Sequence, residues 1–264
     1  MPTAVNGNTN VNYDIRGSGS PVTLFNHSGT SNLSWSEVFL EILATTHIIL
    51  APDHRGTGLS GPATEYTIAD LAADGFEVLK AEDIERPVVV GTSMGGAVAQ
   101  AFSLNYSEHV ESLVLIGTFA GASVRVAPEP WVNELYRRGF QETDIVNRWR
   151  MLLPTIYGKR YLERHEEVAL ELELKGLRYT TAETMKWHGN AVGKFDAYDR
   201  LPALKARTLV VHGDEDPIIP LENGKILADI IQDSELVVLE GLGHLPASES
   251  PVDVSQLIER FIAA

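Results

Sequence analysis

The sequence predicts an α/β fold in which a mostly parallel sheet of eight strands is flanked by helices. Short apolar runs, many of them β-branched, alternate along the chain with longer segments of helical periodicity, and this alternation is typical of parallel sheets covered on both faces. Several reactive side chains directly follow such runs, at the carboxyl ends of strands, where functional groups collect in these sheets. The length of 264 residues suits one large domain, or a domain with an insertion.

The elements are expected in the following order. The chain opens with a β-hairpin over residues 3–16, because Asn6-Gly7-Asn8 is a turn sequence and apolar residues alternate with polar ones after it. The later strands are short buried runs, and the helices between them repeat apolar residues every three or four positions. We expect strands at residues 21–25, 47–51, 87–90, 112–116, 207–212 and 235–239, and helices at residues 35–43, 66–83, 94–106 and 252–262.

A helical lid is predicted between the strands at residues 112–116 and 207–212, before the last two strands. Residues 120–199 carry 12 basic and 12 acidic side chains, whereas the remainder carries 9 and 24, which is the whole net charge of −15. The segment also holds three of the four tryptophans, namely Trp131, Trp149 and Trp187. An aromatic insertion at strand ends is typical of a lid over a site. We therefore assign residues 1–119 and 200–264 to the core and residues 120–199 to the lid.

The composition excludes several kinds of function. The chain has no cysteine, which rules out thiol catalysis, disulfides and thiolate metal sites. No paired histidines or carboxylates with metal-ligand spacing lie on a predicted helix, and no phosphate-binding loop is present, so neither a metal nor another cofactor is expected. The acidic balance argues against nucleic acid and anionic membranes as partners. With no signal peptide and no apolar run of membrane-spanning length, we expect a cytoplasmic protein. The oligomeric state is left open, a homodimer included.

The stretch Gly91-Thr92-Ser93-Met94-Gly95 predicts a serine at a sharp junction between a buried strand and a helix of small residues. Such a junction brings the residues two before and two after the serine into contact, which only glycine allows. The serine is then strained, with its hydroxyl at the carboxyl end of the strand and a helix N-terminus behind it. A Gly-rich turn that contains serine by chance is the alternative, and the flanking strand and helix favour the catalytic interpretation.

A serine nucleophile needs a base to take its proton and an acid to orient that base. Candidates for both follow buried strands: Asp214 and Asp216 come after the strand at 207–212, and His244 lies in a Gly-flanked loop after the last strand. The chain order of nucleophile, acid and histidine is the order known from α/β-hydrolases. Of the other histidines, His27, His54 and His212 also sit at strand ends, His188 lies in the insertion, and His47, His109 and His165 are expected to be structural or solvated.

The chain resembles α/β-hydrolase-fold enzymes of the serine esterase and lactonase type over nearly its full length. Four motifs carry this resemblance, at residues 91–96, 53–60, 213–217 and 241–244. The resemblance implies that Ser93 is the nucleophile, Asp216 the triad acid and His244 the general base. It favours Asp216 over Asp214 because the family places its acid there, and it places the lid between about Ala120 and Asp199.

The same resemblance implies an oxyanion hole made of two backbone N–H groups. Met94, the residue after the nucleophile, should supply one, and the loop after the strand at 21–25 should supply the other. The His-Gly pair usual in similar hydrolases is replaced here by Asn26-His27, which puts Ser28 at the donor position and leaves Gly29 as the alternative. The Asn-x-x-Gly-Thr sequence at this point resembles the 3-oxoadipate enol-lactonase branch.

Serine at position 93 indicates acyl transfer, because similar dehalogenases and epoxide hydrolases need aspartate there. We therefore expect a hydrolase of a small carboxylic ester or lactone. A hydrolase of C–C bonds in β-diketones and a cofactor-free perhydrolase are alternatives, as is a non-catalytic ligand receptor on the same fold. A neutral substrate is the default, although Arg125, Arg137, Arg148 or Arg150 could meet a carboxylate. The residues expected to bind substrate are His27, Gly29, Phe119, Trp131, Trp149, Trp187 and His188.

Overall fold

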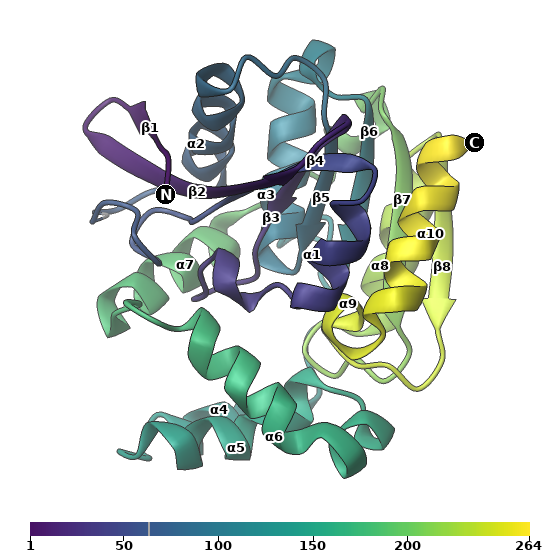
Figure 1. The fold of residues 1–264 in the computed structure, drawn as a ribbon. Helices are drawn as coiled ribbons and strands as arrows, with labels where there is room; N and C mark the ends of the chain where they lie inside the picture. The colour runs from purple at the N-terminus through teal and green to yellow at the C-terminus, as the bar shows by residue number, and fades with distance from the viewer. Residues whose placement is uncertain (63) are drawn as a thin grey trace.

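The computed structural model describes residues 1–62 and 64–264, and it confirms the predicted sheet of eight strands. The strand order is β1-β2-β4-β3-β5-β6-β7-β8. The pairs β1–β2 and β2–β4 are antiparallel, and all later pairs are parallel. Figure 1 shows β1 and β2 crossing the other strands at one side of the sheet. The strands are β1 (Thr3–Asn6), β2 (Thr9–Gly17), β3 (Ser20–Phe25), β4 (His47–Pro52), β5 (Val88–Thr92), β6 (Ser112–Ile116), β7 (Arg207–Gly213) and β8 (Ser234–Leu239).

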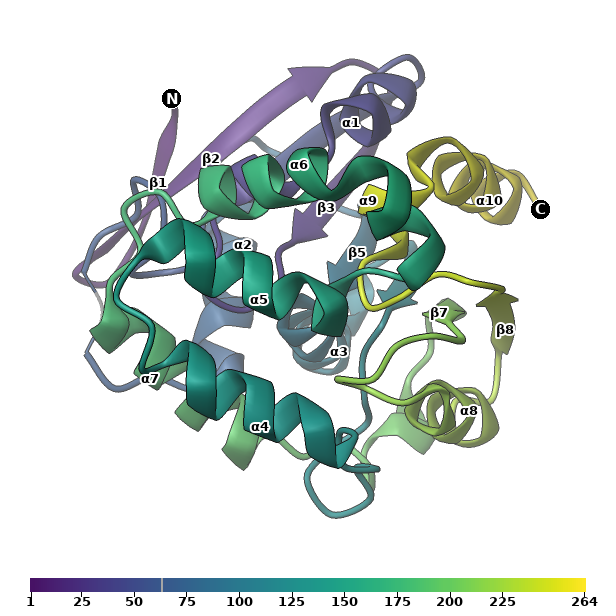
Figure 2. The same ribbon diagram turned by 90° about the horizontal axis from the view of Figure 1, so that it is seen from below.

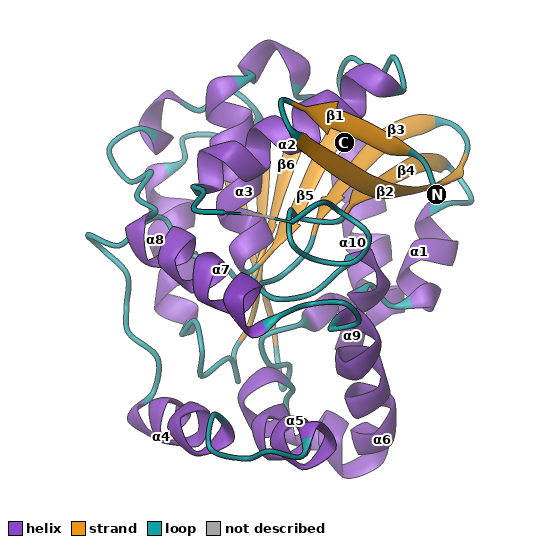
Figure 3. Ribbon diagram, turned by 90° about the vertical axis from the view of Figure 1, so that its left-hand side faces the viewer, coloured by secondary structure: helices purple, strands orange, loops and turns teal. Residues whose placement is uncertain are grey.

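Helices cover both faces of the sheet, as the unbroken apolar runs of its central strands require. Figure 3 shows α2, α3 and α8 on one side of the sheet and α1 and α10 on the other. Successive residues of a strand point to opposite faces, so Val89 packs with the α2 and α3 side, whereas Val88 and Val90 pack with the α1 and α10 side. These helices are α1 (Glu37–Leu43), α2 (Ile68–Ala81), α3 (Met94–Asn105), α8 (Leu221–Ile230), α9 (Pro246–Glu249) and α10 (Pro251–Ala263).

Four further helices form an insertion between β6 and β7, and we call residues 130–194 the insertion. In Figure 1, α4, α5 and α6 lie below the sheet, and in Figure 2, seen from below, they lie in front of it. The insertion has a small apolar core of its own, built around Trp149, Leu153 and Tyr157, and Leu245 of the core joins it. Its helices are α4 (Pro130–Gly139), α5 (Ile145–Ile156), α6 (Lys159–Gly176) and α7 (Ala182–Lys194).

Most predicted elements are present, with small differences at their ends. The helix expected at 35–43 begins at Glu37, because Asn32–Ser34 forms a separate 3₁₀ turn and Trp35 is extended. The helix α8 was not predicted, although it lies between two strands that were. No helix within the described residues is both long and apolar enough to cross a membrane.

Candidate active site

Ser93 lies at the turn where β5 ends and α3 begins, in a strained backbone conformation. Its φ of 55° and ψ of −118° fall where residues other than glycine are rare, and such a residue costs about 1–3 kcal/mol. The turn is held because the Ser93 N–H donates to Ile116 O at 2.9 Å and the Ser93 carbonyl accepts the Thr118 hydroxyl at 2.7 Å. A Cβ on Gly91 would collide with the carbonyl group of Gly95, as expected, whereas a Cβ on Gly95 would collide with the backbone of Phe25 and Asn26 at the end of β3 rather than with Gly91.

The structure brings Ser93, His244 and Asp216 together from three distant parts of the chain. His244 Nε2 lies 2.9 Å from Ser93 Oγ, and His244 Nδ1 lies 2.7 Å from Asp216 Oδ2. The remaining Asp216 oxygen accepts the N–H groups of Ile218 at 3.0 Å and Ile219 at 2.9 Å. These bonds fix the carboxylate so that it orients the imidazole with Nε2 toward the serine hydroxyl, which is the geometry of an activated nucleophile.

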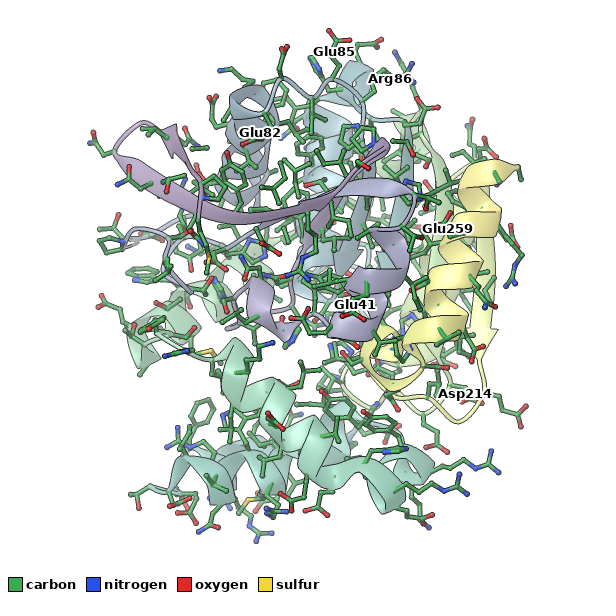
Figure 4. All side chains as sticks on the ribbon, in the orientation of Figure 1. Glu41, Glu82, Glu85, Arg86, Asp214 and Glu259 are labelled. Carbon is green, nitrogen blue, oxygen red and sulfur yellow. The ribbon has the colours of Figure 1, made fainter. Side chains whose placement is uncertain are left out.

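Asp214, the rival acid, points away from this group. It is exposed and accepts the Gly241 N–H at 2.6 Å, so it links the loop after β7 to the loop after β8. Figure 4 shows its side chain on the outside of the molecule, below β8. Asp216 is buried instead, at 5 % exposure. Of the two acids, only Asp216 contacts His244.

His212 lies next to the triad acid candidate Asp216, on the side away from Ser93. Its Nε2 donates to Ile219 O at 2.7 Å and lies 3.6 Å from Asp216 Oδ2. Burial lowers the pKa of His212, although the charge of Asp216 opposes this effect. A neutral His212 therefore braces the turn that carries Asp216 and has no contact with Ser93.

The loop that carries His244 is tied to the insertion by two hydrogen bonds, and a third within the core connects Glu249 to this loop. The His244 N–H donates to Ile156 O at 2.7 Å. Glu249 accepts the N–H of Gly243 with one oxygen and the N–H of Gly158, at the start of α6, with the other, both at 2.8 Å. Burial raises the pKa of Glu249 to about 7, and the two N–H donors work against this rise. The insertion and the histidine loop are therefore held as one unit at this point.

Two backbone N–H groups beside Ser93 are free to bind an oxyanion. Among the described residues, the N–H groups of Met94 and Ser28 have no hydrogen-bond partner, and both residues line the same cavity as Ser93. The Gly29 N–H is already used, because it donates to His188 Nδ1 at 2.8 Å. The geometry therefore favours Ser28 over Gly29 as the second donor.

Three histidines lie in or against the loop that contains Ser28, and two of them, His54 and His188, are buried. Burial lowers the pKa of His27 to about 3 and that of His54 to about 4, and it also lowers the pKa of His188 well below its usual value. His54 Nε2 donates to Asn26 O at 3.0 Å. The three rings are therefore neutral at physiological pH. The bonds of His54 to Asn26 O and of His188 to the Gly29 N–H hold the loop in place, whereas His27 Nε2 has no partner among the described residues.

A cavity of about 200 Å³ lies between the sheet and the insertion and opens onto Ser93 and His244. Its wall is mostly apolar, with a few polar groups, as is usual for small-molecule sites. It is smaller than the ~300–1,000 Å³ typical of drug-sized ligands, so it suits a small substrate. The lining residues are His27, Ser28, Ser93, Met94, Phe119, Arg125, Tyr136, Trp149, Ile156, Glu173, Met185, Gly189, Val192, Ile218, Ile219, His244 and Leu245.

The residues predicted to bind substrate divide into two groups. His27, Phe119 and Trp149 lie on the cavity wall. Four others do not. Trp131 is 44 % exposed on the outside of α4, and Trp187 packs against the core of the α2 and α3 side. His188 and Gly29 lie behind the wall, where they bond each other. The presence of a tryptophan in the insertion therefore does not predict that it lines the cavity, because the helix face it occupies depends on how the helices pack.

Glu173 is a cavity residue that the sequence reasoning missed. It is 1 % exposed, its Oε1 accepts the Tyr157 hydroxyl at 2.8 Å, and its Oε2 has no partner among the described residues. Burial raises the pKa of Glu173 to about 7. The sequence does contain a sign that Glu173 is buried, because Glu173 shares the buried face of α6 with Ala169, Leu170 and Gly176.

No cluster that could hold a metal ion occurs among residues 1–62 and 64–264.

Comparison with known proteins shows what the whole chain is similar to. A model described as the alpha/beta hydrolase family matches residues 17–257. A poly(3-hydroxyalkanoate) depolymerase of Ectopseudomonas oleovorans is 32 % identical over 92 % of this chain and 84 % of its own length. A 2-hydroxymuconate semialdehyde hydrolase of Pseudomonas sp. (strain CF600) is 30 % identical over 96 % of this chain and 90 % of its own length.

Solved structures extend the likeness to the whole fold. The structure of Est816, described as an N-acyl homoserine lactone degrading enzyme, has a TM-score of 0.84 at 27 % identity and covers 98 % of this chain and 100 % of its own. The enol-lactonase of Burkholderia xenovorans LB400 has a TM-score of 0.83 at 24 % identity and covers 100 % of both chains. At this identity the second likeness concerns the fold alone.

Proposed function

The chain belongs to the alpha/beta hydrolase family, and we propose that it is a serine hydrolase of small carboxylic esters or lactones that works through an acyl-enzyme. One observation carries this proposal: an unbroken hydrogen-bonded series from Asp216 through His244 to Ser93 Oγ, which opens into a small cavity. Serine at this position forms an ester with the acyl group, which water can then cleave.

The proposed reaction uses groups that the structure already aligns. Ser93 Oγ attacks the carbonyl carbon while His244 Nε2 takes its proton, and the Asp216 carboxylate stabilises the resulting imidazolium. The N–H groups of Met94 and Ser28 stabilise the negative oxygen of the tetrahedral intermediate. When the intermediate collapses, the bond from the carbonyl carbon to the leaving oxygen breaks, and His244 gives its proton to that oxygen.

The acyl-enzyme is then hydrolysed by the same groups. His244 takes a proton from water as the water oxygen attacks the acyl carbon, and it returns a proton to Ser93 Oγ when the acid leaves. With a lactone, the leaving hydroxyl stays attached to the acyl group and departs with it. The tethered leaving group can reattack the acyl carbon, so fast entry of water is needed.

The insertion serves as a lid in this proposal, with residues 120–199 as the lid and residues 1–119 and 200–264 as the core. Trp149 and Ile156 of α5 contribute apolar wall to the cavity that Ser93 lines, and exclusion of water strengthens the electrostatic stabilisation at the reacting carbonyl. The tie between Glu249 and the start of α6 fixes the lid to the core at that end. The helix α7 is fixed to the core as well, because His188 accepts the Gly29 N–H and the Thr184 hydroxyl donates to Gly56 O.

A hydrolase of C–C bonds is the second candidate. It is favoured by the relative named a 2-hydroxymuconate semialdehyde hydrolase, which covers 96 % of this chain. The same triad would serve such a reaction. After serine or water attacks the ketone, the C–C bond of the tetrahedral intermediate breaks, and His244 gives its proton to the expelled carbon instead of to an oxygen. A panel of esters, lactones and β-diketones of graded chain length separates these reaction classes.

The test is the burst and turnover of p-nitrophenyl acetate by the wild type and by Ser93→Ala. We expect turnover by the wild type and loss of at least about a thousandfold in the variant. Ser18→Ala, which changes an exposed serine in the loop between β2 and β3, is the matched control and should behave as wild type. Tight ligand binding with negligible turnover by the wild type would favour a receptor instead.

A further inference from the structure

Arg125 places an unpaired positive charge in the wall of the cavity. It lies in the segment between β6 and α4 and lines the cavity together with Ser93 and Phe119. Its Nε is buried, and it pairs with no carboxylate or carbonyl among the described residues. Burial lowers the pKa of the guanidinium, which nevertheless stays charged at neutral pH. A half-buried cation without a partner is costly, and an anion bound beside it would relieve that cost.

The other three arginines considered for this role are already satisfied. Arg137 forms two bonds with Glu134 on the exposed side of α4. Arg148 donates twice to the Glu142 carbonyl oxygen, and Arg150 pairs with two glutamates of α6. None of these three lines the cavity. Arg125 is thus the arginine of this group that is available to a ligand.

The side chain of Arg125 is positioned to present its N–H groups rather than its face. Its guanidinium carbon lies over the Phe119 ring, 4.3 Å from the ring centre, in a cation–π contact. The donors along the edge remain free to bind a carboxylate with two parallel hydrogen bonds. Arg125 and Val192 also line an outer groove that includes Pro128 and Gly193, so the guanidinium lies where the cavity meets the surface.

No acidic group near the cavity forms an ion pair or hydrogen bond with Arg125 among the described residues. Asp216 acts on Arg125 only through its charge, which opposes the effect of burial on the pKa of the guanidinium, and its oxygens are bonded by two backbone N–H groups and by His244. Glu173 lines the same cavity from α6, and its one described hydrogen bond is to the Tyr157 hydroxyl rather than to Arg125. The chain as a whole repels anions through its net charge of −15, so a local cation is needed if an anionic substrate is to bind.

We propose that Arg125 forms a subsite for a carboxylate, and that the natural substrate is a small ester or lactone that carries a free carboxylate group. The inference rests on the proposed function, since it assigns the acid group of the substrate for that reaction. It makes Arg125 a specificity-determining residue, because a neutral analogue of the same shape leaves the guanidinium unpaired.

The test compares acids with their neutral amides at equal shape. The substrates are the monoethyl esters of malonic, succinic, glutaric and adipic acids, each paired with the ethyl ester in which the free carboxylate is replaced by a carboxamide. At one or two chain lengths, the wild type should hydrolyse the acid with a kcat/KM at least about tenfold above that of the amide, as expected for a charge-assisted hydrogen-bonded pair.

In Arg125→Met the ratio of kcat/KM for the acid to kcat/KM for the amide should fall to about one. Arg125→Lys should retain part of the preference for the acid, since lysine keeps the charge but loses the planar guanidinium group. Arg137→Met is the matched control and should keep the wild-type ratio. An equal loss on acid and amide in Arg125→Met would assign the residue a structural role, and a wild-type ratio of one or less at every chain length would overturn the proposal.

Binding to Ser93→Ala separates this inference from the proposed function. Calorimetric titration of Ser93→Ala and of Ser93→Ala/Arg125→Met with the same monoethyl esters measures the subsite without turnover. Tighter binding of acid than of amide, lost in the double variant, supports the subsite even if no ester is hydrolysed. Equal binding of acid and amide overturns the subsite even if hydrolysis through Ser93 is established.

Discussion

Replacing Glu173 by glutamine tests whether the buried carboxyl of the cavity is ionised at a cost. Burial raises the pKa of Glu173 from 4.5 to about 7 in the folded protein, while the Tyr157 hydroxyl, which donates to it at 2.8 Å, limits the rise. One pKa unit corresponds to about 1.4 kcal/mol. The rise is therefore worth about 3 kcal/mol, and no discount for solvent screening applies because the side chain is fully buried.

The sign of the effect follows from proton linkage. The folded state holds the proton of Glu173 to a higher pH than the unfolded state does, so this group stabilises the fold below pH 4.5. That contribution is lost as the pH rises to about 7. Glutamine has nearly the same shape, can still accept the Tyr157 hydroxyl and does not titrate, so it removes the pH dependence of this one group.

The assay is urea unfolding of the wild type and Glu173→Gln at pH 5 and pH 8.5. The free energy of unfolding of the wild type, relative to that of the variant, should fall by about 2–3 kcal/mol between the two pH values. Glu249 titrates in both proteins and cancels in the difference. Glu171→Gln, at an exposed position of the same helix, is the control and should change stability by less than about 0.5 kcal/mol at either pH. A difference between wild type and Glu173→Gln that does not change with pH would refute the reasoning.

Two further substitutions test how Ser93 and His244 are held. Gly91→Ala should destabilise the protein by about 3 kcal/mol or more in urea unfolding, because the new Cβ meets the carbonyl group of Gly95. Gly193→Ala is the control in α7, where a Cβ meets nothing within 4 Å, and it should stabilise the protein by about 0.5–1 kcal/mol. Equal effects of the two alanines would contradict this. Glu249→Gln should lower Tm, and it should lower the kcat for ester hydrolysis several-fold at pH 8. The reason is that the amide NH₂ would face the N–H of either Gly243 or Gly158, so that one of the two present hydrogen bonds is replaced by two donors facing each other. An unchanged kcat would show that this tie does not position the histidine loop.

The sequence predicted the core of the fold well because its signals there are local. The runs of β-branched residues, the turn at Asn6-Gly7-Asn8 and Gly91 before Ser93 each reflect a steric requirement that acts within a few residues. The loops that carry Asp216 and His244 follow such strands, and the parallel sheet brings all strand ends to one edge. Spacing and chain order were therefore sufficient to select three residues that the structure places in contact.

The walls of the cavity were less predictable because they depend on packing between helices. Trp131 and Trp149 look equivalent in the sequence, yet one is exposed on α4 and the other lines the cavity from α5. Glu173 was overlooked because a charged residue in a helix is usually solvated, and its place on a buried face becomes clear only from its neighbours. Arg125 could be picked out among four arginines only when the partners of the other three were known.

The most direct test of the central claim is the site of covalent labelling by a fluorophosphonate, read by intact mass and peptide mapping. The account predicts one adduct per chain, on Ser93, with no adduct on Ser93→Ala and labelling slowed at least about a hundredfold in His244→Gln. An unlabelled wild-type protein, or an adduct on any residue other than Ser93, would contradict it.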